Sequence, residues 1–228
     1  MTIAGHSMHA AGILAALIGT MLCGSASAAE GNATPQKVSK SGIAYLSDDQ
    51  VGPPDLVNAI KSRRGGGKLL NLDRILLHSP NFTKGWNTMF AAIRNQLSLP
   101  AKLRELAIMQ IGVLNKSEYE WAQHEGEFLK AGGTREQLNA LRNGAATGTA
   151  DAKLFDDAER MTLQLTREMT QQINVSDATM KRARSMLPDA HVVELVGTIA
   201  GYNMVSRFVV ATGVELEGNA PTEVGARK

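Results

Sequence analysis

The chain has 228 residues with 24 basic and 22 acidic side chains, giving a net charge of +2, which excludes the strong basic excess typical of a nucleic-acid-binding protein. Its one cysteine, Cys23, excludes an internal disulfide, and no thiolate site can exist beyond that residue. Aromatic residues make up only 4% of the chain, whereas Leu, Ala and Met are plentiful. This composition favours packed helices over a β-sandwich or barrel.

Residues 1–28 are typical of a secretory signal peptide. An apolar run from Ala10 to Leu22 is followed by small residues and by Ala26-Ser27-Ala28, an A-x-A cleavage signal. The segment before this run lacks Lys and Arg, which is atypical. An uncleaved membrane anchor and a lipoprotein modified at Cys23 are the alternatives. Each predicts an exported protein, and the cleaved form predicts a periplasmic one without a membrane segment.

The remaining chain is predicted to form one helical domain, residues 53–215, between an extended, flexible N-terminal arm, residues 29–52, and a C-terminal tail, residues 216–228. The arm is rich in Ser, Gly, Lys and Asn, so it should contribute little to the core. Within the domain, a short helix over residues 55–63 ends at a triple-glycine segment. A short apolar segment, residues 69–77, then precedes a helix over residues 82–96.

A central helix is predicted over residues 100–114, because between Leu106 and Leu114 only Gln110 is polar. Five further helical segments follow: residues 117–131, 134–141, 151–169, a short helix opening at Ser176, and residues 188–212. No segment alternates between apolar and polar residues as a strand would. The sequence therefore predicts an all-α fold, a single-domain helical bundle.

Residues 117–131 place a carboxylate and an imidazole on the apolar side of their helix. Glu120 and His124 fall within the same arc as Trp121 and Phe128, while the polar side is complete without them. Because burying polar groups costs free energy, their inward placement needs a reason. One reason is a catalytic pair in which Glu120 orients His124 for proton transfer. The alternative is a structural hydrogen bond between helices.

Other residues are weaker candidates for chemistry. Glu105 shares a side of the central helix with apolar residues, and the neighbouring Arg104 could bind a carboxylate. His78 ends a segment at a place where loops often carry functional side chains. His191 and Glu194 form an H-x-x-E step, which together with Glu120 and His124 could in principle bind a metal, although no metal site is predicted.

Three motifs together resemble the carboxymuconolactone decarboxylase family. They are Leu99–Ile108, the segment Ser117-Glu118-Tyr119-Glu120-Trp121-Ala122-Gln123-His124, and Ala131-Gly132-Gly133, with weaker similarity at residues 78–81 and 201–207. This resemblance implies the all-α fold of the alkyl hydroperoxidase D type and a homo-oligomer, a trimer or hexamer. The family's peroxidase-like branch carries a C-x-x-C-x-x-x-H motif and a Glu on the preceding helix.

Ser117 and Glu120 stand at the two thiol positions of that motif, while His124 and Glu105 match its His and Glu. Thiol peroxidase activity is therefore excluded, and the acid/base half of the site remains. The resemblance implies a decarboxylase-like lyase that needs no cofactor and acts on a small carboxylated or lactone substrate. His124, Glu120 and Glu105 would be catalytic. The predicted substrate-binding residues are Arg104, His78, Tyr119, Trp121 and Arg207.

Three alternatives remain open at this point. The same residues could catalyse double-bond isomerisation or lactone hydrolysis, or the chain could be a non-catalytic exported helical binding or assembly module. A cavity beside His124 and Glu120 would favour an enzyme, whereas tight packing around them would favour the module.

Overall fold

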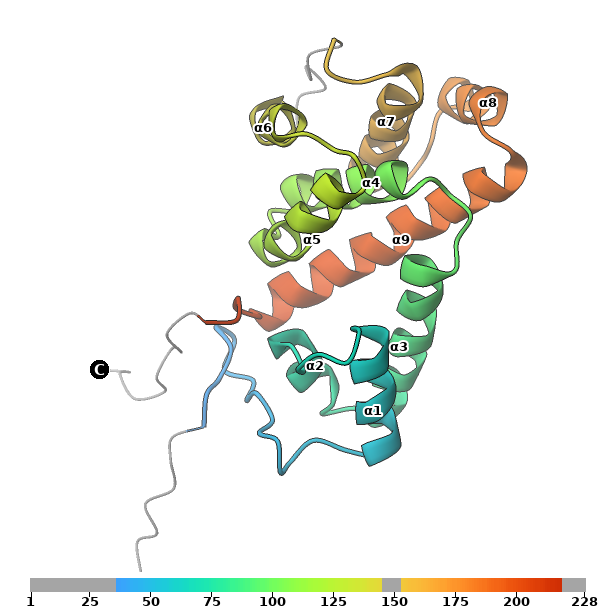
Figure 1. Ribbon diagram of the computed structural model, residues 1–228. Helices are drawn as coiled ribbons and strands as arrows, with labels where there is room; N and C mark the ends of the chain where they lie inside the picture. Colours follow the sequence, from blue (N-terminus) through green and yellow to red (C-terminus); the bar gives the residue numbers. More distant parts are fainter. Residues whose placement is uncertain (1–35, 145–152, 219–228) are drawn as a thin grey trace, which may run out of the picture. The chain divides into compact units, whose positions relative to one another are not determined.

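The computed structural model describes residues 36–144 and 153–218, and over these ranges the protein is helical (Figure 1). The only β-pairing in these ranges is an isolated bridge between Val38 and Ala44, so the predicted all-α fold is confirmed. The helices are α1 (Pro54–Arg63), α2 (Asn71–Leu76), α3 (Pro80–Asn95), α4 (Ala101–Leu114), α5 (Glu118–Lys130), α6 (Arg135–Gly144), α7 (Asp157–Gln171), α8 (Asp177–Met186) and α9 (Asp189–Thr212).

Helix α4 is the central helix, as its apolar sequence predicts. It packs against α5, α6, α7 and α9, and Leu106, Ala107, Ile108, Met109 and Ile111 have no exposed surface. Glu105 is buried within the same helix, 2% exposed. A charged side chain at this depth requires a partner, which α5 supplies.

Gly132 and Gly133 follow α5 and allow the chain to leave the helix close to the buried side chain of Phe128. Gly132 adopts a φ of +94°, a conformation that residues with a side chain rarely adopt. A Cβ atom at Gly133 would lie 2.2 Å from Cε1 of Phe128, which is fully buried. The face predicted for α5 is confirmed, since Glu120, Trp121, His124 and Phe128 are all buried.

Two segments differ from the sequence predictions. Helix α7 begins at Asp157 rather than near residue 151, because Asp156 is its N-cap and accepts a hydrogen bond from the backbone N–H of Glu159. The described part of the N-terminal arm also contributes to the core. Val38 and Tyr45 are buried, and the Tyr45 hydroxyl accepts a hydrogen bond from the backbone N–H of Glu215.

The predicted signal peptide and most of the predicted C-terminal tail lie outside the described residues. Among the helices in residues 36–144 and 153–218, none combines the length and the apolar character that crossing a membrane requires. The described residues belong to one compact unit, and the candidate site lies within it.

Candidate active site

A buried hydrogen bond joins Glu105 of α4 to His124 of α5. Their Oε2 and Nδ1 atoms are 2.7 Å apart, and both residues are buried. The ring of Tyr202, from α9, meets the imidazole edge-on with centroids 5.0 Å apart. The imidazole is therefore held by one hydrogen bond and one aromatic contact, which fix its orientation.

The other ring nitrogen of His124, Nε2, lies 3.4 Å from Nη1 of Arg94. A guanidinium can only donate hydrogen bonds, so Nε2 must be the acceptor and Nδ1 must carry the proton that is donated to Glu105. Burial lowers the pKa of His124, and the hydrogen bond to Glu105 only partly opposes this effect. At neutral pH the ring is thus a neutral imidazole with its basic lone pair directed at Arg94.

Glu105 remains ionised although it is buried. Burial alone would raise its pKa, but the hydrogen bond with His124 and the positive charges of Arg104 and Arg94 together hold the pKa below its usual value. Nε of Arg104 lies 3.2 Å from Oε1 of Glu105. The carboxylate therefore makes His124 a stronger base without taking its proton at neutral pH.

Glu120 is buried beside this pair but does not hydrogen-bond to His124. The prediction that Glu120 orients the imidazole is wrong, because Glu105 occupies Nδ1 and both Glu120 oxygens lack hydrogen-bond partners. Burial raises the pKa of Glu120 well above its usual range. The Ser117 hydroxyl opposes this weakly from nearby, outside hydrogen-bonding geometry. Burial therefore favours the protonated form of the Glu120 carboxyl, which makes it a potential proton donor.

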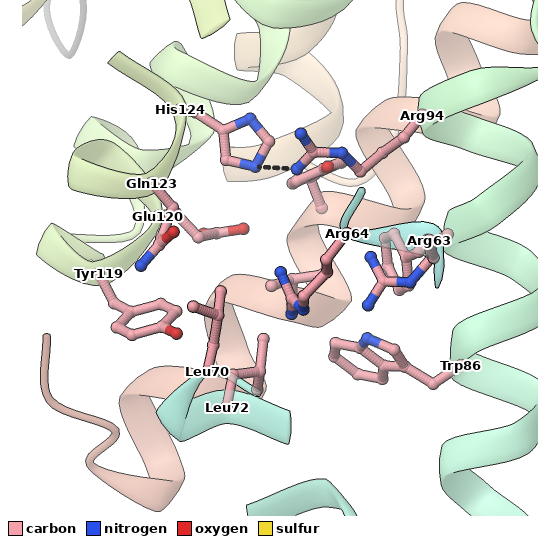
Figure 2. Close-up of a pocket in the computed structure, with 13 residues that line it drawn as sticks. Arg63, Arg64, Leu70, Leu72, Trp86, Arg94, Tyr119, Glu120, Gln123 and His124 are labelled. Atoms are coloured by element: carbon pink, nitrogen blue, oxygen red, sulfur yellow. Dashed lines mark hydrogen bonds between the residues drawn. The ribbon is translucent and has the colours of Figure 1, made fainter. Parts of the chain in front are cut away.

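His124 and Glu120 face a small cavity of about 50 Å³ (Figure 2). In this view the α5 side chains Tyr119, Glu120, Gln123 and His124 lie on one side, opposite side chains from α1 and α3. This volume holds about four water molecules or a few heavy atoms of a ligand. A base and a protonated acid thus line one cavity that has room for a reacting group.

A wider space of about 390 Å³ adjoins this cavity, and we call it the vestibule. The two share five lining residues, so the vestibule leads to the inner cavity: Arg63, Arg64, Leu70, Arg94 and Gln123. Lys68 adds a fourth cation to the vestibule wall, and Glu127 is its one carboxylate. The vestibule is therefore suited to an anionic group.

The vestibule cations are only partly neutralised by protein carboxylates. Arg63 and Arg64 share Asp73, with Nη2 of Arg64 donating to Oδ1 of Asp73 at 2.8 Å. Burial and the repulsion of Arg64 lower the pKa of Arg63 to about 10, which leaves it charged at neutral pH. Among the described residues, Arg94 has no carboxylate within ion-pairing distance, and it interacts with the Glu105 carboxylate only at longer range.

The segment after α9 holds two walls of the inner cavity together. The Glu217 carboxylate accepts hydrogen bonds from the Tyr119 hydroxyl at 2.9 Å and from Nε2 of Gln123 at 2.7 Å. It also accepts one from the backbone N–H of Asn71, at the start of α2. Tyr119 thus lines the cavity, as predicted for a substrate-binding residue, while its hydroxyl is held by Glu217.

The other four predicted substrate-binding residues do not line either space. Arg104 pairs with Glu105, and Nε2 of His78 is 2.8 Å from the Ala44 carbonyl oxygen. Trp121 packs in a second core cluster with Arg142 stacked 4.1 Å above its ring, and Arg207 donates to Asn203. Their side chains are engaged in structural contacts, so the structure gives no support for a role in binding.

The idea of a metal site shared by the two helices also lacks structural support. In the described ranges, no cluster of three or more His, Cys, Asp or Glu side chains is arranged to hold a metal ion. Glu194 instead accepts hydrogen bonds from the backbone N–H groups of Ser98 and Leu99, before α4.

Sequence reasoning missed the three arginines that line both spaces. Arg63 and Arg64 end a short helix just before a glycine segment, where basic residues normally face solvent and complement the helix dipole. The position of Arg94 could have been inferred from the sequence. It lies four residues after the buried Phe90 and eight after the buried Trp86, so it is on the same side of α3.

Comparison with known proteins agrees with the fold. The sequence model of the carboxymuconolactone decarboxylase family matches residues 80–160, which confirms the predicted resemblance over that segment. No curated protein matches the sequence.

Solved structures share the fold at low sequence identity. An uncharacterized peroxidase-related protein from Silicibacter sp. TM1040 is 15% identical, over 82% of this chain and 96% of its own, with a TM-score of 0.64. A protein from Ralstonia eutropha JMP134, described as an alkylhydroperoxidase AhpD core, is 15% identical over 76% and 90%, with a TM-score of 0.65. The debrominase Bmp8 is 14% identical over 76% and 90%, with a TM-score of 0.62. At these identities the likeness concerns the fold alone.

Proposed function

We propose that this chain, whose residues 80–160 match the sequence model of the carboxymuconolactone decarboxylase family, is a cofactor-independent acid/base enzyme acting on a small carboxylated or lactone substrate. One observation carries the proposal: His124, held by Glu105, and the protonated carboxyl of Glu120 line the same cavity behind a cationic vestibule. A protonated acid and an unprotonated base that line the same cavity are typical of enzymes that transfer protons.

In a decarboxylation, the vestibule arginines would hold an anionic group of the substrate while the reacting carbon enters the inner cavity. The bond to the departing CO₂ breaks and its electron pair moves into the conjugated lactone. The proton of the Glu120 carboxyl then passes to carbon, and Glu120 regains a proton from water. The positive charges of Arg63 and Arg64, which also line the inner cavity, would stabilise the enolate oxygen formed in the first step.

Isomerisation and lactone hydrolysis are open to the same two groups. In isomerisation, Nε2 of His124 would remove a proton from one carbon and Glu120 would protonate another. In hydrolysis, Nε2 would take a proton from the attacking water and Glu120 would protonate the leaving oxygen. The cavity beside both side chains favours an enzyme over a non-catalytic binding module.

The assay that tests the proposal uses the chain from residue 29 with γ-carboxymuconolactone and related small lactone acids. CO₂ release reports decarboxylation, deuterium uptake from solvent reports isomerisation, and acid release reports lactone opening. Turnover by any of the three routes would support the proposal. Absence of all three across the substrate panel, with a folded protein, would contradict it.

We also propose that a second copy of the chain covers an apolar face on α3 and α9. This face is formed by Phe82, Met89, Val193, Gly197, Ala200 and Met204, all exposed, and Phe82 stacks on Phe208 of α9 at 6.1 Å. An exposed apolar surface of this kind often marks a protein interface. An oligomer, a trimer or hexamer, is expected by size-exclusion chromatography with light scattering.

The substitution Met204→Glu is expected to dissociate this oligomer, because it places a charge within the apolar face. Ile173→Glu is the matched control, since Ile173 is 82% exposed in the turn after α7. A wild-type chain that elutes only as a monomer, or equal dissociation by both substitutions, would refute the assignment of this face. An exported location likewise remains a proposal, which N-terminal sequencing after secretion would test at Ala28.

A further inference from the structure

In the isomerisation and hydrolysis routes His124 acts as the base through the lone pair on Nε2, yet in this structure Arg94 donates a hydrogen bond to that atom. A guanidinium cannot take a proton, so the base is engaged as long as Arg94 stays there. An N–H donor in a good hydrogen bond lies about 2.9 Å from an oxygen acceptor, so this contact at 3.4 Å is long and weak. A better partner for Arg94 would release the imidazole.

Arg94 is the one vestibule arginine that has no carboxylate within ion-pairing distance in the described part of the chain. Arg63 and Arg64 are held by Asp73, while Glu127, the carboxylate on the vestibule wall, is paired with Lys130 at 2.8 Å. Arg94 lines both the inner cavity and the vestibule. It is therefore placed to contact His124 from one side and a ligand from the other.

We propose that the vestibule is a carboxylate-binding subsite, and that a carboxylate bound there draws Arg94 away from Nε2 of His124 and so frees the catalytic base. This inference rests on the proposed function and adds how its site is switched on. A bidentate arginine–carboxylate contact is charge-assisted and roughly twice as strong as a hydrogen bond to a neutral acceptor, so the exchange is favourable. The substrate's own anionic group would activate the base.

The charged groups around His124 determine how its pKa should respond. Glu105 faces it from α4, Arg94 from α3 and Tyr202 from α9. Glu120 and Glu127 lie on its own helix, and Arg63 and Arg64 face the cavity from α1 and the residue after it. Of these, Arg94 makes direct contact with Nε2 and disfavours the protonated ring. Neutralising Arg94 with a bound carboxylate should consequently raise the pKa of His124.

Histidine-labelled protein followed by NMR tests this inference without any turnover. The probe is acetate, with sodium chloride at equal ionic strength as the control for screening. Acetate is expected to shift the His124 ring-nitrogen signals saturably and to raise the His124 pKa by about one unit, the lower range for a nearby charge change. The His78 and His191 signals, remote from both spaces, should not move, and the His124→Ala spectrum assigns the peak.

Arg94→Met is expected to raise the His124 pKa without acetate and to abolish the response to acetate. Arg94→Gln serves in its place if the methionine variant does not fold. Arg207→Met is the matched control, because Arg207 donates to Asn203 and lines neither space, and it should respond as wild type does.

The inference is overturned if acetate leaves the His124 signals unchanged, or if it moves them equally in wild type and Arg94→Met. If such a result were combined with turnover that depends on His124, it would refute the displacement of Arg94 by a bound carboxylate and leave the proposed function intact. A saturable response without turnover on any substrate would keep the subsite and remove the proposed function. The two failures are thus distinguishable.

Discussion

His124→Ala is expected to lower kcat/KM by at least about a hundredfold for isomerisation or lactone hydrolysis, the two routes in which His124 is the base, as the loss of one general acid/base group typically does. The imidazole is the only group in the inner cavity with an available basic nitrogen near neutral pH, and Glu105 holds it in the productive tautomer. Its neighbours are not expected to replace it, because Arg94 cannot accept a proton, burial favours the protonated form of Glu120, and Glu105 does not line the cavity.

Two controls separate lost chemistry from lost structure. His191→Ala removes a partly exposed imidazole in the first turn of α9, far from both spaces, and should keep full activity. His124→Gln keeps a polar side chain of similar length and should fold even if the alanine variant is destabilised by the cavity it leaves. Wild-type activity in a folded His124 variant would refute the assignment of this residue as the base.

The helix that carries His124 could be predicted from the sequence, because the spacing of its apolar residues depends only on residues that are close together in the chain. Apolar residues recur at helical spacing, glycines mark the end, and Glu120 and His124 interrupt the apolar side. The start of α7 was harder, since Asp151 and Asp156 are both suitable N-caps and only the packed structure shows that Asp156 is used. Burial of Tyr45 could not be predicted either, because it depends on contacts with residues about 170 positions away.

The partner of His124 illustrates the same limit within the site. Spacing on one helix favoured Glu120, four residues away, but the bond is made by Glu105 across the contact between α4 and α5. The family resemblance matched Glu105 to the Glu that accompanies the family's His, whereas helix periodicity could say only that Glu105 faces inward. Arg63 and Arg64 lie at the end of α1 and Arg94 lies on α3, so their convergence is a property of the tertiary fold.

Glu120→Gln is expected to abolish most of the turnover and, in the same protein, to change the pH dependence of stability. The amide cannot donate an acidic proton, so a loss of about a hundredfold is expected, as for His124. The geometry of the cavity should be retained because Gln has nearly the same shape. Glu118→Gln is the matched control on the same helix, since Glu118 is 73% exposed and pairs with Arg142 at the surface.

The sign of the stability effect follows from the direction of the pKa shift. Burial raises the pKa of Glu120 in the folded protein, while the unfolded chain has the ordinary value near 4.3. Below that value the carboxyl is protonated in both states, and its contribution to stability is fully present. As pH rises, the unfolded state loses its proton first, so wild type loses stability up to the folded pKa.

Gln does not titrate, so the Tm of Glu120→Gln minus that of wild type should increase from pH 4 to pH 8. Differential scanning calorimetry at several pH values measures how this Tm difference changes with pH. Burying an amide in place of a carboxyl changes Tm by the same amount at every pH, so it does not affect that change. A pH-independent difference, equal to that of Glu118→Gln, would mean that Glu120 is ionised at neutral pH and cannot be the proton donor.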